Sequence, residues 1–118
     1  MPFTEEVYGN VKKITWEWRS HAATGDASET TAGTYTGAIE RLVTVPGTVA
    51  DQPDDNYDIT VEDGDDVDAL MGAGANRHDT NTQQVGADDL GIVAYDRLTF
   101  NVANAGNDNT GTVYLYIR

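Results

Sequence analysis

The chain has 118 residues, 20 of them Asp or Glu and 7 Lys or Arg, so its formal net charge is −13. This length is typical of one domain with one modest core, and the absence of cysteine excludes a disulfide framework and a thiolate zinc site. The acidity argues against binding to nucleic acid or to an anionic membrane, because both kinds of binding need Lys and Arg.

The first ten residues are expected to form an arm ahead of the first strand. Phe3, Val7 and Tyr8 are apolar anchors in this otherwise polar segment. They are candidate contacts with a neighbouring copy or with a partner surface, although a frayed terminus fits the same pattern. The remaining residues, 11–118, are expected to form a single β-sandwich domain.

Alternation of apolar and polar residues predicts most of the strands. It is clearest at 11–19, where Ile14, Trp16 and Trp18 fall on one face. The two tryptophans are interpreted as core residues rather than as an exposed platform for sugar. The same alternation predicts strands at 57–62, 98–102 and 112–117, with weaker patterns at 28–35, 39–45 and 91–95. The glycine-rich turns between them favour an all-β antiparallel fold, either a β-sandwich or a jelly-roll-like one, with little helix.

An acid-rich stretch lies between residues 51 and 68, which hold nine of the 20 acidic residues. Clustered carboxylates suit a hard cation such as calcium, so Asp63, Asp65 and Asp66 are weak metal candidates. The register of an EF-hand fails, because two apolar residues would occupy ligand positions. A hairpin turn with solvated acids is therefore preferred, and no metal or other cofactor is expected.

The segment after this stretch shows little periodicity. One or two helical turns are predicted at 65–71, and a long irregular loop is predicted at about 72–89, with a short strand near Val85. Three residues of the loop are candidate interface residues: Asn76, Arg77 and His78.

The two C-terminal strands are predicted to pair as a hairpin, with residues 103–111 as an exposed loop. Tyr114 and Tyr116 lie on the polar side of the last strand, opposite its apolar face. Tyrosine is enriched at protein interfaces, so both are candidates for contact with a partner subunit. Ordinary half-exposed strand tyrosines fit the same pattern.

No residue spacing in the sequence is typical of a catalytic centre. His21 and His78 are far apart, and neither serine lies in a G-x-S-x-G motif. The glycine pair at 72–74 lacks the lysine and the helix of a phosphate-binding loop. No catalytic residue is assigned and the chain is not expected to be an enzyme. The enzymatic alternative is a metal-assisted hydrolase that uses the acidic stretch.

A resemblance to a known family rests on three stretches: PDDNYDITV at 53–61, GAGANR at 72–77, and residues 98–118, which end in TVYLYIR. Together they resemble small structural proteins of tailed double-stranded DNA bacteriophages, in particular capsid decoration (cement) proteins. The resemblance spans residues 8–118 and carries over no active-site residue.

The resemblance implies a β-sandwich or jelly-roll domain that forms a dimer or trimer and binds the major capsid protein. Its place would be the outside of the capsid lattice of the virion, after synthesis in the cytoplasm of the bacterial host. A cysteine-free chain suits that reducing compartment. The alternative is a module of the phage tail or fibres, or a carbohydrate-binding β-sandwich.

Overall fold

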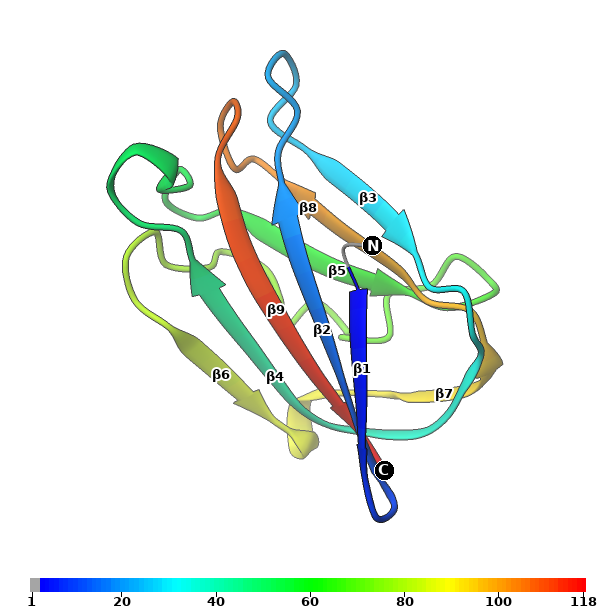
Figure 1. Ribbon diagram of the computed structural model, residues 1–118. Helices are drawn as coiled ribbons and strands as arrows, with labels where there is room; N and C mark the ends of the chain where they lie inside the picture. The colour runs from blue at the N-terminus through cyan, green and yellow to red at the C-terminus, as the bar shows by residue number, and fades with distance from the viewer. Residues whose placement is uncertain (1–2) are drawn as a thin grey trace.

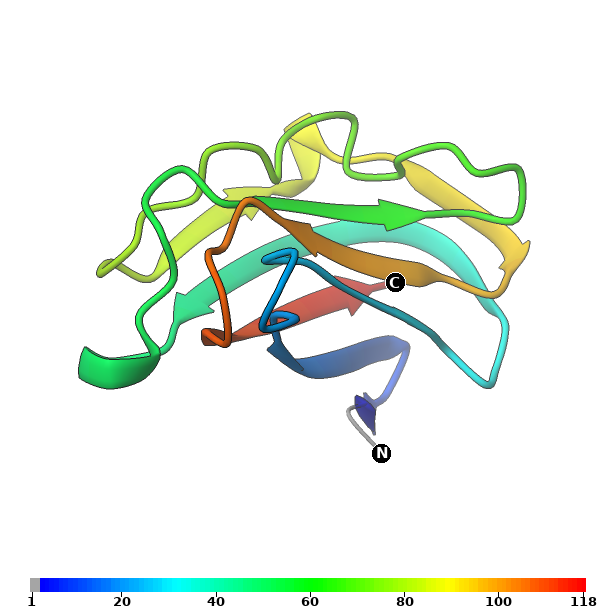
Figure 2. The ribbon, with the colours of Figure 1, turned by 90° about the horizontal axis from the view of Figure 1, so that it is seen from above.

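The computed structural model describes residues 3–118, which form two facing antiparallel sheets (Figures 1 and 2). The strands are β1 (Phe3–Tyr8), β2 (Val11–Arg19), β3 (Ala27–Thr30), β4 (Tyr35–Pro46), β5 (Asp58–Glu62), β6 (Gln83–Gly86), β7 (Ile92–Asp96), β8 (Thr99–Ala103) and β9 (Thr110–Ile117). Two single-turn 3-10 helices, η1 (Val49–Asp51) and η2 (Ala87–Asp89), complete the elements. The predicted all-β, sandwich-like fold is confirmed.

The larger sheet has the order β1-β2-β9-β4-β6, with β7 also paired to β4, and the smaller sheet has the order β3-β8-β5. The core lies between them. Trp16 is fully buried and its ring lies 5.7 Å from that of Phe100 in β8, while Trp18 packs against Tyr57 at 5.6 Å. Both tryptophans are core residues, as predicted, because the alternation of β2 turns every second side chain toward the opposite sheet.

Strand β4 bends, and that bend brings β7 behind the larger sheet (Figure 1). Its first part pairs with β7 and its second part with β9 and β6, with register shifts between Tyr35 and Gly37 and between Ile39 and Arg41. Such bulges increase the local twist and re-aim the strand. Gly37 has a φ of +141°, and a Cβ there would lie 2.7 Å from the backbone of Arg118. The bend therefore needs glycine at this position.

The N-terminal segment differs from the expected arm. Residues Phe3–Tyr8 form the edge strand β1, in which Phe3 lies opposite Trp16 and Tyr8 opposite Val11. Five of the six side chains of this strand are exposed, so the segment lacks the apolar alternation by which a strand is predicted. Residues 1 and 2, which the expected arm includes, lie outside the described residues.

The predicted hairpin of the two C-terminal strands is wrong. β8 lies between β3 and β5 in the smaller sheet, whereas β9 lies between β2 and β4 in the larger one. Residues 104–109 therefore cross from one sheet to the other. The two strands have the same apolar alternation because they face the same core from opposite sides.

Residues 65–71 form turns rather than the predicted helical turns. The carboxylate of Asp68 explains this difference, because it accepts the backbone N–H groups of Val61, Leu70 and Gly72 at 2.9 to 3.1 Å. Short acidic side chains compete in this way with helical hydrogen bonds. No helix within residues 3–118 is long and apolar enough to cross a membrane.

The segment from residue 68 to residue 77 follows the edge of β5. Ala69 donates its N–H to the carbonyl of Val61 at 2.7 Å, and Ile59 donates to Gly74 at 2.8 Å. This segment pairs an edge that would otherwise be open to other strands. Further along, β6 and η2 lie within the predicted loop at 72–89, and the short strand expected near Val85 is confirmed as β6.

Candidate functional site

The outer face of the larger sheet, here called the front face, is turned toward the viewer in Figure 1. The strand register aligns Lys13 of β2, Tyr116 of β9 and Arg41 of β4 in one row across it. Tyr114 lies in the next row, between Thr15 and Val43. The outward direction of both tyrosines agrees with the predicted alternation, and their role as interface residues stays a prediction.

The rings of these two tyrosines form cation–π contacts with the side chains of Lys13 and Arg41. The Lys13 ammonium lies 4.6 Å from the ring centroid of Tyr114 and 5.8 Å from that of Tyr116. The Arg41 guanidinium lies 5.3 Å from the Tyr116 ring. A cation–π contact at an exposed site contributes about 0.5–1 kcal/mol. These contacts therefore restrict the positions of the two tyrosine rings. Another molecule that binds this aromatic surface loses little side-chain conformational entropy in fixing them.

The edge strand β1 carries two exposed apolar side chains, Val7 and Tyr8, which point to opposite faces of the strand. Tyr8 shares the front face with Glu6 and Lys13, whereas Val7 lies on the other face of β1. The Tyr8 hydroxyl donates to Glu6 Oε2 at 2.6 Å, and this hydrogen bond raises the pKa of Tyr8. Phe3, the third candidate of the segment, is different. Its ring lies 6.2 Å from that of Trp16 and 5.1 Å from that of Phe100, so it anchors β1 to the core.

Buried tyrosines also help to fix the strands. The Tyr35 hydroxyl of β4 donates a hydrogen bond to Glu5 Oε2 of β1, which links two strands that are not neighbours in the sheet. Burial, followed by this hydrogen bond, raises the pKa of Tyr35 above its ordinary range. Burial also raises the pKa of Tyr57 to about 12.

The candidate residues of the long loop lie beside β5 and have structural contacts there. The N–H of Asn76 donates to Asp58 Oδ1 at 2.9 Å. Arg77 donates its N–H to the carbonyl of Tyr57 at 2.7 Å, and its guanidinium donates to the carbonyl of Ala75. These contacts hold the segment against the smaller sheet, and any role in an interface stays a prediction.

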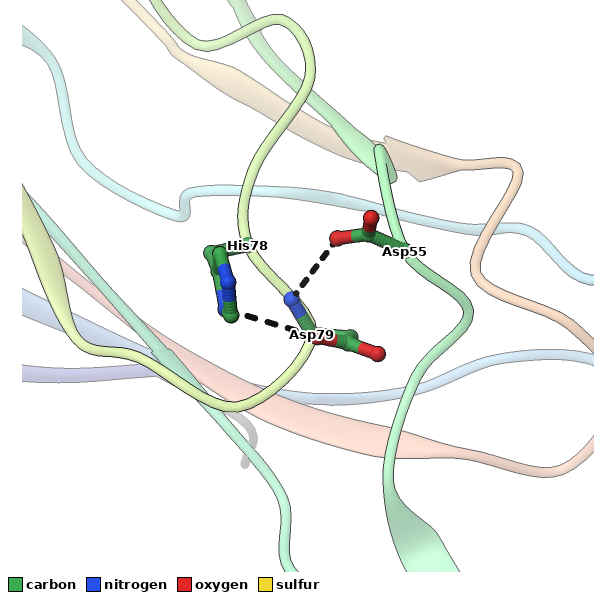
Figure 3. A group of neighbouring side chains, drawn as sticks. All are labelled: Asp55, His78 and Asp79. Carbon is green, nitrogen blue, oxygen red and sulfur yellow. Dashed lines mark hydrogen bonds and ion pairs between the residues drawn. The ribbon is translucent and has the colours of Figure 1, made fainter.

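His78, the third of these candidates, lies in a cluster with Asp55 and Asp79 (Figure 3). One potential ligand atom from each of the three residues lies within 4.8 Å of the others, a grouping able to hold a metal ion. His78 Nδ1 lies 3.3 Å from Asp79 Oδ1, and the N–H of Asp79 donates to Asp55 Oδ1 at 3.3 Å. The sequence gives no signal for this cluster, because 22 residues separate Asp55 from His78 and no ligand spacing joins them.

The ring of His78 accepts hydrogen bonds from the backbone of the turn that follows it. Nδ1 also accepts the N–H groups of Thr80 at 3.1 Å and Asn81 at 3.0 Å. Both amides therefore point at Nδ1 from within the same turn. A cation on Nδ1 would have to displace both amides. The two hydrogen bonds at Nδ1 stabilise the turn at 78–81.

The three weak metal candidates of the acidic stretch have other surroundings. Asp63 Oδ1 accepts the N–H of Asp65 at 2.8 Å and that of Val67 at 3.1 Å, which closes a turn of the kind that Asp favours. Asp65 and Asp66 are exposed at the tip of that turn. Part of the acidic stretch is thus explained by hydrogen bonds to the backbone, and part remains on the surface.

Comparison of the chain with protein-family models finds no matching family, and comparison with curated proteins finds no matching relative. The function is therefore inferred from the surfaces of the molecule and from the resemblance found in its sequence.

Proposed function

We propose that the protein is a bacteriophage capsid decoration protein that binds the outer surface of the head lattice and stabilises it. The observation that supports this most is the front face, which is an open sheet surface with Tyr114 and Tyr116 held in place by Lys13 and Arg41. A protein that braces a lattice needs broad contact surfaces rather than a deep cleft, and aromatic side chains with Arg are enriched in such contacts.

The composition also supports this role. A net charge of −13 keeps free copies soluble and apart before they bind, and it keeps them away from DNA. In the proposal the chain acts in the virion, is made in the host cytoplasm, and has the major capsid protein and further copies of itself as partners. A dimer or trimer that contacts several capsomers multiplies a modest affinity for each site, since the second contact is intramolecular.

The positions of the tryptophans bear on the carbohydrate-binding alternative. A sugar platform formed by Trp16 and Trp18 would need both rings on the surface, and both are buried in the core. The proposed role includes no catalytic step, and the hydrogen bonds at His78 Nδ1 are assigned to the stability of its turn.

The experiment that tests the proposal is a count of copies in purified particles of the phage that encodes the chain. Quantitative mass spectrometry would compare the protein with the most abundant shell protein. A ratio within a few-fold supports a decoration role across the lattice. A copy number in the dozens or below would instead assign the protein to the neck, tail or fibres, and absence from the particles would overturn the virion proposal.

A further inference from the structure

A second surface lies on the side of the molecule away from β1 and β2, and Figure 2 shows it along the upper edge of that view. It is formed by residues 63–72, η2 and β7, and is called the rear face below. Seven large apolar side chains are exposed in the described part of the chain, and four of them lie here: Val67 (59% exposed), Met71 (71%), Ile92 (74%) and Tyr95 (81%).

The two segments that carry these side chains run side by side. The N–H of Gly64 donates to Asp96 Oδ1 at 3.1 Å, and the N–H of Gly91 donates to the carbonyl of Ala69 at 2.9 Å. These contacts join the start of one segment to the end of the other, so the two run in opposite directions as one surface. Met71 also lines a hollow of about 490 Å³, together with Val85, Asp88 and Asp89.

The backbone holds two of these side chains outward in an unfavourable conformation. Met71 has a φ of 55° and Tyr95 a φ of 57°, both in the left-handed region. The Thr36 hydroxyl accepts the N–H of Tyr95 at 2.8 Å, and the carbonyl of Asp68 accepts that of Met71 at 3.1 Å. A backbone conformation of this kind persists only where surrounding contacts fix it, so these hydrogen bonds keep both side chains in place.

Unpaired carboxylates surround these apolar side chains. Asp65, Asp66, Asp88 and Asp89 are all exposed, and within residues 3–118 none of them forms an ion pair. The sequence has no Lys or Arg between residues 42 and 76 or between 78 and 96. The rear face thus combines an apolar centre with a negatively charged surround.

We propose that the rear face is a docking surface for a basic protein surface that presents an apolar side chain between Lys or Arg residues. Opposite charges would steer the encounter, and burial of Met71 and Ile92 would hold the complex. A second copy of this chain is a poorer occupant, because it brings a net charge of −13. This inference deepens the proposed function. It rests on that function in one respect, which is that the basic partner is the head shell.

The test titrates the protein with two short fluorescein-labelled peptides that contain the same number of lysines. One peptide alternates Lys with Leu and the other alternates Lys with Ser. We expect the Lys/Leu peptide to bind about tenfold more tightly, since burial of a few methylene groups on Met71 and Ile92 is sufficient for that difference. The double variant Met71→Ser with Ile92→Ser should lose this preference.

The matched control is Val49→Ser, which removes an apolar side chain from η1, far from the rear face. Val49 is 90% exposed, more than Met71 or Ile92. This control should keep the preference for the Lys/Leu peptide. Equal binding of both peptides to the wild-type protein would show that net charge alone attracts them and would overturn the inference. Wild-type behaviour of the double variant would also overturn it.

A second measurement separates this inference from the proposed function. Binding of the wild-type protein to stripped phage heads tests the function, and binding of the double variant tests the rear face. If the heads bind both proteins equally, the rear face is excluded as the docking surface while the function stands. A third outcome is that the heads bind neither protein, while the wild-type protein prefers the Lys/Leu peptide and the double variant does not. In that case the rear face is a docking surface, and the head shell is not its partner. Wild-type dimers that the double variant abolishes would overturn the choice of a basic partner.

Discussion

Gly111 of β9 lies directly opposite Trp18 of β2, and a Cβ on Gly111 would lie 2.6 Å from Cε2 and 2.9 Å from Nε1 of the Trp18 indole. The ring therefore lies over the glycine, at the point where the central strands of the larger sheet meet. Packing of this kind depends on the missing side chain rather than on the conformational freedom of glycine.

We expect Gly111→Ala to destabilise the fold by about 1–3 kcal/mol, because the added methyl group forces the indole out of its position. Urea denaturation followed by tryptophan fluorescence measures the change. The control is Gly33→Ala, since no atom lies within 4 Å of a Cβ at Gly33. Equal stability of the two variants would contradict the packing described here.

Alkaline pH should lower the stability of the protein through its buried tyrosines. Burial raises the pKa of Tyr57 to about 12 in the folded state, against about 10 in an unfolded chain. The folded protein holds that proton more tightly, so its contribution is complete below pH 10 and is lost as the pH rises from about 10 to about 12. The loss is at most about 1.4 kcal/mol per pH unit for one such group.

Denaturant titrations at several pH values across this window measure the slope, and Tyr57→Phe should make it shallower. The raised pKa of Tyr35 acts in the same direction, so part of the slope should remain. The exposed Tyr95 provides the control variant Tyr95→Phe. A Tyr57→Phe slope that matches the wild type would show that this proton is not linked to folding.

The carboxylate of Asp68 should stabilise the segment that pairs with the edge of β5. Asp68→Ala leaves three backbone N–H groups without their acceptor, and we expect a loss of about 1–3 kcal/mol. Hydrogen exchange should become faster at Val61 and Leu70. The control is Asp65→Ala, at an exposed position, where a change below about 0.5 kcal/mol is expected.

Removal of metal should not change the thermal stability. Backbone amides already occupy His78 Nδ1, so EDTA should leave the melting temperature of the purified protein unchanged. His78→Ala should lower the stability by about 1 kcal/mol, because it removes the acceptor of both amides. A fall in the melting temperature with EDTA that zinc or calcium restores would show that a cation holds this cluster.

The tyrosines of the front face should contribute to binding if the proposed function is right. The double variant Tyr114→Ser with Tyr116→Ser should weaken binding to stripped heads by about tenfold or more, as is typical of central aromatic contacts. Thr112→Ser on the same face of β9 is the control. Circular dichroism would establish that both variants fold, and unchanged binding by the tyrosine variant would exclude the front face as a contact.

Strands with one face in the core could be predicted from the sequence. In β2 the residues Ile14, Trp16 and Trp18 alternate with polar ones, and the predicted range 11–19 is the observed one. β1 could not be predicted, because both of its faces are largely exposed and it contributes mainly Phe3 to the core. The pairing of the strands could not be predicted either, because β8 and β9 have the same alternation of apolar and polar residues although they lie in different sheets.

The candidate sites were predictable to a smaller extent. The outward direction of Tyr114 and Tyr116 follows from the period of a strand. The rear face was missed because Met71 and Ile92 are 21 positions apart and become neighbours only through the contact of Gly91 with Ala69. The sequence of the acidic stretch does not indicate which of its carboxylates accept hydrogen bonds from the backbone of turns, as those of Asp63 and Asp68 do, and which are exposed on the surface.

The position of β9 affects how the molecule can be assembled during translation. β9 is the last strand of the sequence, and it lies between β2 and β4 in the larger sheet. Until β9 has left the ribosome, β2 and β4 have no common neighbour, and Trp16 has Phe3 of β1 beside it but lacks Val113, its neighbour on β9. The larger sheet must therefore close after its other strands have been synthesised. A nascent chain stalled before β9 would expose two open strand edges, and it would be a substrate for chaperones and a source of aggregation.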